Sequence, residues 1–240
     1  MTTLLYQTDS YLRDFAATVA AVDEATRAVL LDRTAFYPGG GGQPHDLGTL
    51  GAGDETWPVV KVEKRGAEVA HLLGGEAPLP AVGTAVHGAL DWERRYRLMR
   101  THTAMHVLCG VIWRDFGAQV TGGQMHLDRA RMDFELEDLN PDRVRSIEER
   151  ANAVIAAGAP VSVRILPREE AFQIPDLIRT KINLLPPGIT EVRVVSVGEL
   201  DTQADGGTHV ADAREVGGLR IVGTRSKGRI NKRLEVELVD

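Results

Sequence analysis

Cysteine is almost absent from this sequence, because Cys109 is the only one in 240 residues. A single thiol cannot form an internal disulfide, which excludes a disulfide-stabilised scaffold and favours a reducing compartment. The chain also lacks an apolar run of the roughly 18–20 residues that a membrane-spanning helix needs. Its first residues do not combine a basic start with an apolar stretch, as a signal peptide would. We therefore expect a cytoplasmic protein that does not enter a membrane.

Positive charge is in the minority. The chain has 28 Lys and Arg residues against 34 Asp and Glu residues, which gives a formal net charge of −6 at pH 7. An acidic total argues against broad, non-specific binding of nucleic acid, although it allows a local basic surface. Hydrophobic residues make up 43% and charged residues 26%, which is ordinary for a globular protein and excludes collagen-like and disordered classes. The length allows one large domain or two small ones.

The first 90 residues predict short strands separated by turns, a pattern typical of a small barrel or sandwich. The expected strands are Thr18–Asp23, Ala28–Thr34, Trp57–Glu63, Glu68–Leu73 and Thr84–Leu90. Four consecutive glycines, Gly39, Gly40, Gly41 and Gly42, interrupt this pattern just before Gln43. Glycines permit unusual backbone angles and the close approach of another backbone. A flexible hairpin tip is the alternative explanation for this run.

From Asp91 onwards the pattern changes. Asp91–Phe116 contains no proline and a single glycine, and it predicts one long helix. Asn140-Pro141-Asp142 supplies a cap, a first-turn proline and an acidic residue, which predicts a second helix to about Ala157. The strands expected here are Arg131–Leu136, Val161–Leu166, Glu191–Val197, Leu219–Thr224 and Arg229–Val239. We therefore predict the α+β fold class, with a small β domain at residues 1–90 and an α+β domain at residues 91–240.

Two histidines on the long helix form the first candidate for chemistry. His102 and His106 are four residues apart, so both side chains lie on one face of the helix and can reach one metal ion. The zinc-peptidase pattern needs Glu directly after the first histidine, and this position is Thr103. A metallopeptidase is therefore a poor fit. Ordinary packing of two core histidines is the alternative.

A second group of possible ligands lies about a hundred residues further along. Asp205 and His209 flank a Gly-Gly turn that could bring both side chains together, and carboxylate and imidazole both bind zinc. Cys109 is a softer ligand, but it lies seven residues from His102, about 10.5 Å along a helix. We therefore interpret Cys109 as a small core residue.

Several motifs, in this order, resemble one family. The histidine pair is followed by Gly-Gly-Thr-His209, and the accompanying motifs are Tyr37–Gln43, Arg131–Phe134, Glu215–Gly217 and Ser226–Arg233. Together they cover residues 36 to 233 and resemble the editing domain of alanyl-tRNA synthetase. A chain of 240 residues has no room for the synthetase's aminoacylation domain, with its ATP-binding fold, or for its tRNA-recognition domain. The sequence therefore resembles the free-standing AlaX editing proteins of medium length, which implies that the β domain is a small barrel.

The resemblance implies a zinc site with the ligands His102, His106, Asp205 and His209. The family typically carries Cys at the position of Asp205, so a harder and more labile site is expected here, with water as an alternative fourth ligand. The implied reaction is hydrolysis of the ester that joins serine, or glycine, to alanine-specific tRNA. Zinc would either activate a water molecule or orient the substrate, and the sequence leaves both roles open.

The resemblance also suggests where the amino acid would be recognised. Thr121 and Gln124, and with less support Gln119, lie between the histidine helix and the Arg131 strand, where polar groups could bind the serine hydroxyl. Gln43 and the glycine run could close over the same pocket. An ordinary polar loop at residues 119–124 is the alternative.

Two groups of basic residues could contact the acceptor end of the tRNA through its phosphates. The first lies on the long helix and contains Arg94, Arg95, Arg97 and Arg100. The second, on the terminal hairpin, is favoured and contains Arg225, Lys227, Arg229, Lys232 and Arg233. A solvated charged face is the alternative for both.

Two other functions remain open at this stage. The chain could be a non-catalytic tRNA-binding module in which zinc has only a structural role, a possibility raised by Asp205 in place of Cys. It could also be a zinc hydrolase of small esters or amides. No stable protein partner is evident, so we expect a monomer or a weak dimer.

Overall fold

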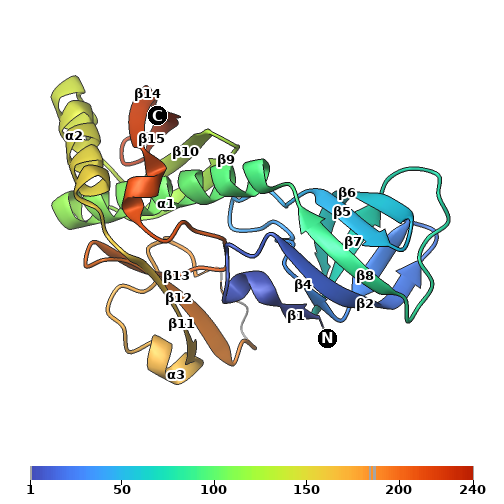
Figure 1. Ribbon diagram of the computed structural model, residues 1–240. Helices are drawn as coiled ribbons and strands as arrows, with labels where there is room; N and C mark the ends of the chain where they lie inside the picture. Colours follow the sequence, from blue (N-terminus) through green and yellow to red (C-terminus); the bar gives the residue numbers. More distant parts are fainter. Residues whose placement is uncertain (1, 184, 186–187, 240) are drawn as a thin grey trace. The chain divides into compact units, whose positions relative to one another are not determined.

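The computed structural model describes residues 2–183, 185 and 188–239 (Figure 1). The chain forms two compact units, Met1–Arg97 and Leu98–Asp240, and each is described by itself. Among the described residues, no helix is both long and apolar enough to span a bilayer.

The first unit contains a closed barrel with the strand order β2-β3-β7-β6-β5-β8. Successive side chains of a strand point to opposite faces, and in β2 the buried residues Phe15, Ala17 and Val19 accordingly alternate with exposed ones. The small barrel implied by the family resemblance is thus confirmed. The barrel strands are β2 (Asp14–Asp23), β3 (Ala28–Leu31), β5 (Gly48–Ala52), β6 (Glu55–Arg65), β7 (Glu68–Leu73) and β8 (Ala85–Leu90). A short parallel pair, β1 (Thr3–Leu4) with β4 (Arg33–Thr34), and the 3₁₀ helix η1 (Leu5–Gln7) complete this unit.

The glycine run forms a closed turn. Gly39, Gly40, Gly41 and Gly42 all have positive φ angles, from 56° to 133°, a backbone conformation that other residues adopt only with strain. The backbone amides and carbonyls of Gly40 and Gln43 form two hydrogen bonds of 2.9 and 3.0 Å. The Tyr37 hydroxyl donates a third, of 3.0 Å, to the Gly40 carbonyl.

A buried arginine holds the base of this turn. The Arg95 side chain is 0% exposed, and its Nε lies 3.0 Å from Asp46 Oδ2. Asp46 Oδ2 also accepts a hydrogen bond of 2.6 Å from the Tyr37 amide. Because its guanidinium is fully used inside the first unit, the expectation that Arg95 contacts phosphate is wrong.

The second unit is built around α1 (Trp92–Phe116), whose first six residues belong to the first unit. From Leu98 to Ile112 every residue is buried except Arg100, as in a helix that is enclosed on all sides. Within this unit the helix runs between a four-stranded and a three-stranded sheet (Figure 1). A Cβ at Gly110 would lie 2.7 Å from the Leu200 side chain, so the glycine allows the turn after β12 to approach the helix.

The four-stranded antiparallel sheet has the order β14-β15-β10-β9. Its strands are β9 (Val120–Met125), β10 (Arg129–Phe134), β14 (Gly218–Ser226) and β15 (Lys232–Val239). The helix α2 (Pro141–Ala157) packs on β14. It begins as predicted, because Asn140 caps it by accepting a 2.9 Å hydrogen bond from the Arg143 amide.

The three-stranded antiparallel sheet has the order β11-β12-β13. Its strands are β11 (Val161–Pro167), β12 (Glu191–Val197) and β13 (Asp201–Ala204), accompanied by the short helices α3 (Arg168–Ala171) and η2 (Ala213–Val216). The expected α+β fold class, with a barrel followed by a long helix on antiparallel strands, is confirmed.

Residues Val120–Met125 form the strand β9, because they pair with β10, so the alternative of an ordinary polar loop is excluded. One expected strand boundary was wrong. The last strand begins at Lys232, and Arg229 lies in the turn before it.

Candidate metal centre

Four side chains of the second unit meet at one point. His102 and His106 come from α1, and Asp205 and His209 come from the loop after β13. One ligand atom from each of the four lies within 4.8 Å of all the others. The structure therefore brings together the four residues that the sequence suggested as zinc ligands.

The geometry of the cluster follows from the two segments that carry it. The imidazole rings of His102 and His106 lie on one helix face, with centroids 5.1 Å apart. In the loop, the Gly207 amide donates a 2.7 Å hydrogen bond to Asp205 Oδ2, which turns the chain back. His209 Nε2 consequently lies 3.0 Å from Asp205 Oδ2, and His102 Nε2 lies 3.5 Å from Asp205 Oδ1.

Asp201, on β13, orients one of these histidines. Its Oδ2 accepts a 2.9 Å hydrogen bond from His106 Nδ1, which leaves His106 Nε2 available as a ligand atom. Gln203 Nε2 donates a second hydrogen bond, of 2.6 Å, to the same oxygen. Arg179 Nε lies 3.5 Å from the other oxygen, Asp201 Oδ1. A carboxylate behind a histidine is the usual arrangement around a protein-bound metal.

Thr103 has a similar position behind the other side of the cluster. Its Oγ1 lies 3.2 Å from His209 Nδ1 and accepts a 3.3 Å hydrogen bond from the Val210 amide. Thr103 therefore orients His209. In the sequence, Thr103 occupies the position at which a zinc peptidase would carry its glutamate base. Sequence reasoning missed Asp201 and this use of Thr103, because both depend on contacts between α1 and segments about a hundred residues away.

Burial controls the charge of the cluster. It lowers the pKa of His102 well below the usual value and lowers the pKa of His209 to about 4. Burial also disfavours the charged form of His106, but the hydrogen bond and the charge of Asp201 outweigh it and raise the pKa of His106. Burial alone would raise the pKa of Asp205, yet the nearby histidines, His102 first, hold it well below its usual value. At neutral pH the site thus favours neutral rings at His102 and His209 and an ionised Asp205, whereas Asp201 favours the protonated form of His106.

This donor set fits a transition metal. Three imidazole nitrogens and one carboxylate oxygen are a common ligand set for Zn²⁺. His102 Nδ1 is buried and has no hydrogen-bond partner among the described residues, which is costly for a polar atom unless the ring is held by another interaction. Cys109 is buried outside this group of four, as expected for a core residue, and burial raises the pKa of its thiol.

The residues expected to recognise the amino acid come from both units. Thr121 lies where β9 is irregular, and its Oγ1 donates a 3.2 Å hydrogen bond to Asn231 Oδ1. Gln124 is exposed and accepts a 2.8 Å hydrogen bond from Arg131. Gln43 belongs to the first unit, where it is 3% exposed beside the glycine turn.

The basic residues of the terminal hairpin differ in how far their side chains are already bound to other residues of the chain. Lys227 and Arg233 both bind Asp133, at 2.9 and 2.7 Å, and the hydrogen bond from Arg233 helps to lower the pKa of Asp133 to about 2. Lys232 is 8% exposed, and its Nζ donates to the carbonyls of Gly228 and Arg229. The Arg229 side chain is exposed to solvent.

Sequence comparisons agree with this fold and site. Residues 192–235, which include Asp205 and His209, match the family described as the threonyl and alanyl tRNA synthetase second additional domain. Residues 7–94, which contain the barrel, match the class II (A) tRNA synthetases. The matched domains define a chain related to the tRNA synthetases.

Full-length relatives make the assignment more specific. The chain is 39% identical over 244 residues to the alanyl-tRNA editing protein AlaX-M of Methanosarcina barkeri, with all of both chains covered. It is 38% identical to AlaX-M of Saccharolobus solfataricus, with 98% of each chain covered. Alanine–tRNA ligase of Ignicoccus hospitalis is 38% identical over 92% of this chain, which spans 24% of that ligase. The chain belongs to the AlaX-M family of alanyl-tRNA editing proteins.

Proposed function

We propose that this protein is a zinc-dependent hydrolase that acts in trans on mischarged alanine-specific tRNA and releases serine, with glycine as a second substrate. One observation carries the proposal: His102, His106, Asp205 and His209 converge in a chain that aligns from end to end with alanyl-tRNA editing proteins. The proposed partner is the acceptor end of the tRNA.

The need for such an activity follows from binding energies. An alanine pocket must reject glycine, which is one methyl group smaller, and serine, which is one hydroxyl group larger. Differences of this size give only about 10–200-fold discrimination in an apolar pocket. A second site that hydrolyses the wrong ester therefore improves the fidelity of translation.

The side chains of the cluster have distinct tasks in this proposal. His102, His106, Asp205 and His209 would hold the ion. When bound, zinc would supply a Lewis acid and a lowered pKa for a coordinated water. Asp201 keeps a proton on His106 Nδ1 and so directs Nε2 inwards. Thr103 fixes the ring of His209, so both rings would enter the reaction already oriented.

The substrate contacts belong to the same proposal. Thr121, whose hydroxyl is held by Asn231, would bind the serine hydroxyl, and Gln124 and Gln43 would contribute polar contacts. The backbone of Gly39–Gly42 would border the bound ester. Lys227, Arg229, Lys232 and Arg233 would lie at or near the RNA, with Lys232 shaping the turn through its carbonyl contacts.

The decisive experiment measures amino acid release from Ser-tRNA and Ala-tRNA prepared on the same alanine tRNA. We expect serine release that stops after chelation and returns with zinc, while alanine stays attached. His102→Ala should abolish release. The matched control is His126→Ala, because His126 is an exposed histidine of the same unit outside the cluster.

Two other results would contradict the proposal. Binding of Ser-tRNA without serine release, in protein that contains zinc, would favour a tRNA-binding module with a structural metal. Release of acid from simple esters, with no preference for a tRNA substrate, would favour a small-molecule hydrolase.

A further inference from the structure

The four-stranded sheet of the second unit has one apolar and one charged face. Residues that pair across antiparallel strands point to the same side. The rows Ile221–Val236–Ala130–Met125 and Leu234–Met132 make the apolar face. The opposite side, which we call the cationic face, comprises Arg129, Arg131, Arg220, Arg225, Lys227 and Arg233 together with Asp133, Glu235 and Glu237.

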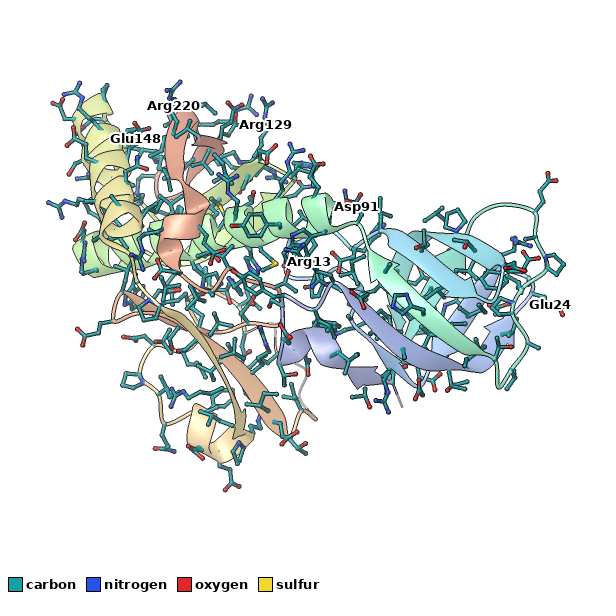
Figure 2. The ribbon with its side chains drawn as sticks, viewed as in Figure 1. Arg13, Glu24, Asp91, Arg129, Glu148 and Arg220 are labelled. Carbon is teal, nitrogen blue, oxygen red and sulfur yellow. The ribbon has the colours of Figure 1, made fainter. Side chains whose placement is uncertain are left out.

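The balance of charge on this face is opposite to that of the whole chain. Six basic and three acidic side chains give the face a net charge of +3, whereas the complete sequence has a net charge of −6. This face therefore carries a local excess of positive charge on an acidic chain. In Figure 2, Arg129 and Arg220 lie near each other at the outer border of this sheet, in line with their shared register partner Glu237.

The ion pairs within the face do not neutralise it. Arg233 and Lys227 share the single carboxylate of Asp133. Glu237 forms an ion pair with Arg129. Arg131 donates its two hydrogen bonds to the uncharged amide of Gln124.

Arg220 and Arg225 carry two of the positive charges that no ion pair neutralises. Both side chains are exposed, and neither forms an ion pair within the described part of the chain. Arg225 lies directly opposite Arg233 on the neighbouring strand. Like charges in directly opposite positions destabilise a sheet, so this arrangement is unfavourable for the protein alone and becomes favourable when a polyanion covers it.

We propose that the cationic face binds the phosphate backbone of the RNA substrate, with Arg220 and Arg225 as the principal phosphate contacts. This inference rests on the proposed function for its choice of polyanion. Arginine suits the role because its planar guanidinium can bind two phosphate oxygens at once. Arg225, Lys227 and Arg233, which the sequence already groups together, all lie on this face. The charges of Lys227 and Arg233 are shared with Asp133.

The test is the affinity for uncharged alanine tRNA, measured by fluorescence anisotropy over a range of salt concentrations. We expect Arg220→Glu with Arg225→Glu to weaken binding by about tenfold or more. The slope of log K against log salt concentration should also become shallower, by about 0.7–0.9 for each lost phosphate contact. Arg220→Gln with Arg225→Gln, which adds no new repulsion from Glu237, should give a smaller loss in the same direction. Zinc content and thermal unfolding check that each variant is folded.

The matched control reverses two exposed arginines of the same unit that lie off this face, Arg145 on α2 and Arg164 on β11. Arg145→Glu with Arg164→Glu makes the same change in net charge and should leave the affinity unchanged. Equal losses in both double variants would overturn the inference, because total charge would then be the cause.

The RNA-binding surface and the proposed hydrolase can be tested separately, because the affinity for uncharged tRNA does not depend on hydrolysis. In one outcome, the Glu and the Gln double variants both bind tRNA with wild-type affinity while the protein still releases serine. This result would overturn the inference that the cationic face binds RNA and leave the proposed function intact. Binding of vesicles rich in anionic lipid, with none of tRNA, would overturn it in favour of a membrane. Loss of affinity in the face variants of a protein that never releases serine would support the surface and overturn the proposed hydrolase.

Discussion

At the scale of single residues, the hydrogen bond between Asp201 and His106 fixes which ring nitrogen carries the proton. Asp201 is 2% exposed, and its charge lies 2.9 Å from His106 Nδ1. A buried carboxylate in this position both orients the ring and makes its other nitrogen a better ligand. Loss of this hydrogen bond should therefore weaken metal binding, which can be measured without an assay of catalysis.

We predict that Asp201→Asn weakens zinc binding by about 10–100-fold. The amide has the same shape but no charge, so the effect reports the electrostatic part of the contact. Competition with a chromogenic chelator gives the affinity and the rate of zinc loss. Asp142→Asn, an exposed carboxylate on α2, is the control and should bind zinc like the wild type. Unchanged zinc affinity in Asp201→Asn would show that His106 needs no orientation by Asp201.

At the scale of secondary structure, a histidine joins two strands of the barrel to the short strand β4 beside it. His71 on β7 is 0% exposed, and its Nδ1 lies 3.2 Å from the Val29 carbonyl on β3. Its Nε2 lies 2.8 Å from the hydroxyl of Thr34 on β4. Burial lowers the pKa of His71 to about 4, so the strands are joined through a neutral ring.

This contact predicts a loss of stability in acid. Between pH 6.5 and about 4 the unfolded chain binds a proton at residue 71 that the folded chain does not, so the free energy of unfolding falls as the pH falls. The full difference corresponds to about 3 kcal/mol. Denaturant titrations of the wild type and of His71→Gln, at several pH values, should show a flatter pH dependence in the variant. His87→Gln, at an exposed histidine of the same unit, is the matched control for the substitution itself.

The elements that could be predicted from the sequence are those with a local signal. β2 alternates buried and exposed residues, and α2 begins with a cap and a proline. By contrast, β9 reads Val-Thr-Gly-Gly-Gln-Met, without a run of β-branched residues, and it becomes a strand because β10 supplies its hydrogen bonds. β9 and β10 are consecutive strands separated by three residues, but the two central glycines of β9 give the segment little strand propensity of its own.

The same distinction applies to the candidate metal centre. The spacing of His102 and His106 is a property of one helix, so the sequence was sufficient to group them. Asp201 and Thr103 act across a contact between α1 and later segments, and the sequence carries no local signal for this. Arg95 was misjudged for the same reason, since its partner Asp46 lies 49 residues away.

At the scale of the whole molecule, a metal that joins α1 to the loop after β13 should stabilise the second unit. A ligand that binds only the folded state adds about 4 kcal/mol when its concentration is 1,000 times its Kd. We predict that chelation lowers hydrogen-exchange protection in residues 98–116 and in β12 and β13, and leaves the barrel strands unchanged. His102→Ala should show the low protection with or without zinc. Equal loss of protection in the barrel and the second unit would contradict a local role for the metal.

The closure of the barrel has a consequence for the order of events during synthesis. β2 pairs early with β3, but its other neighbour is β8, where Asp14 lies opposite Ala89. The first strand of the barrel therefore finds its second neighbour only after about 75 further residues have been made. At roughly 5–20 residues per second this takes about 4–15 s. During that interval one edge of β2 is open, and Phe15 and Val19, which end up in the barrel core, are available to other chains. Nascent protein should therefore need a chaperone most before residue 90 has left the ribosome.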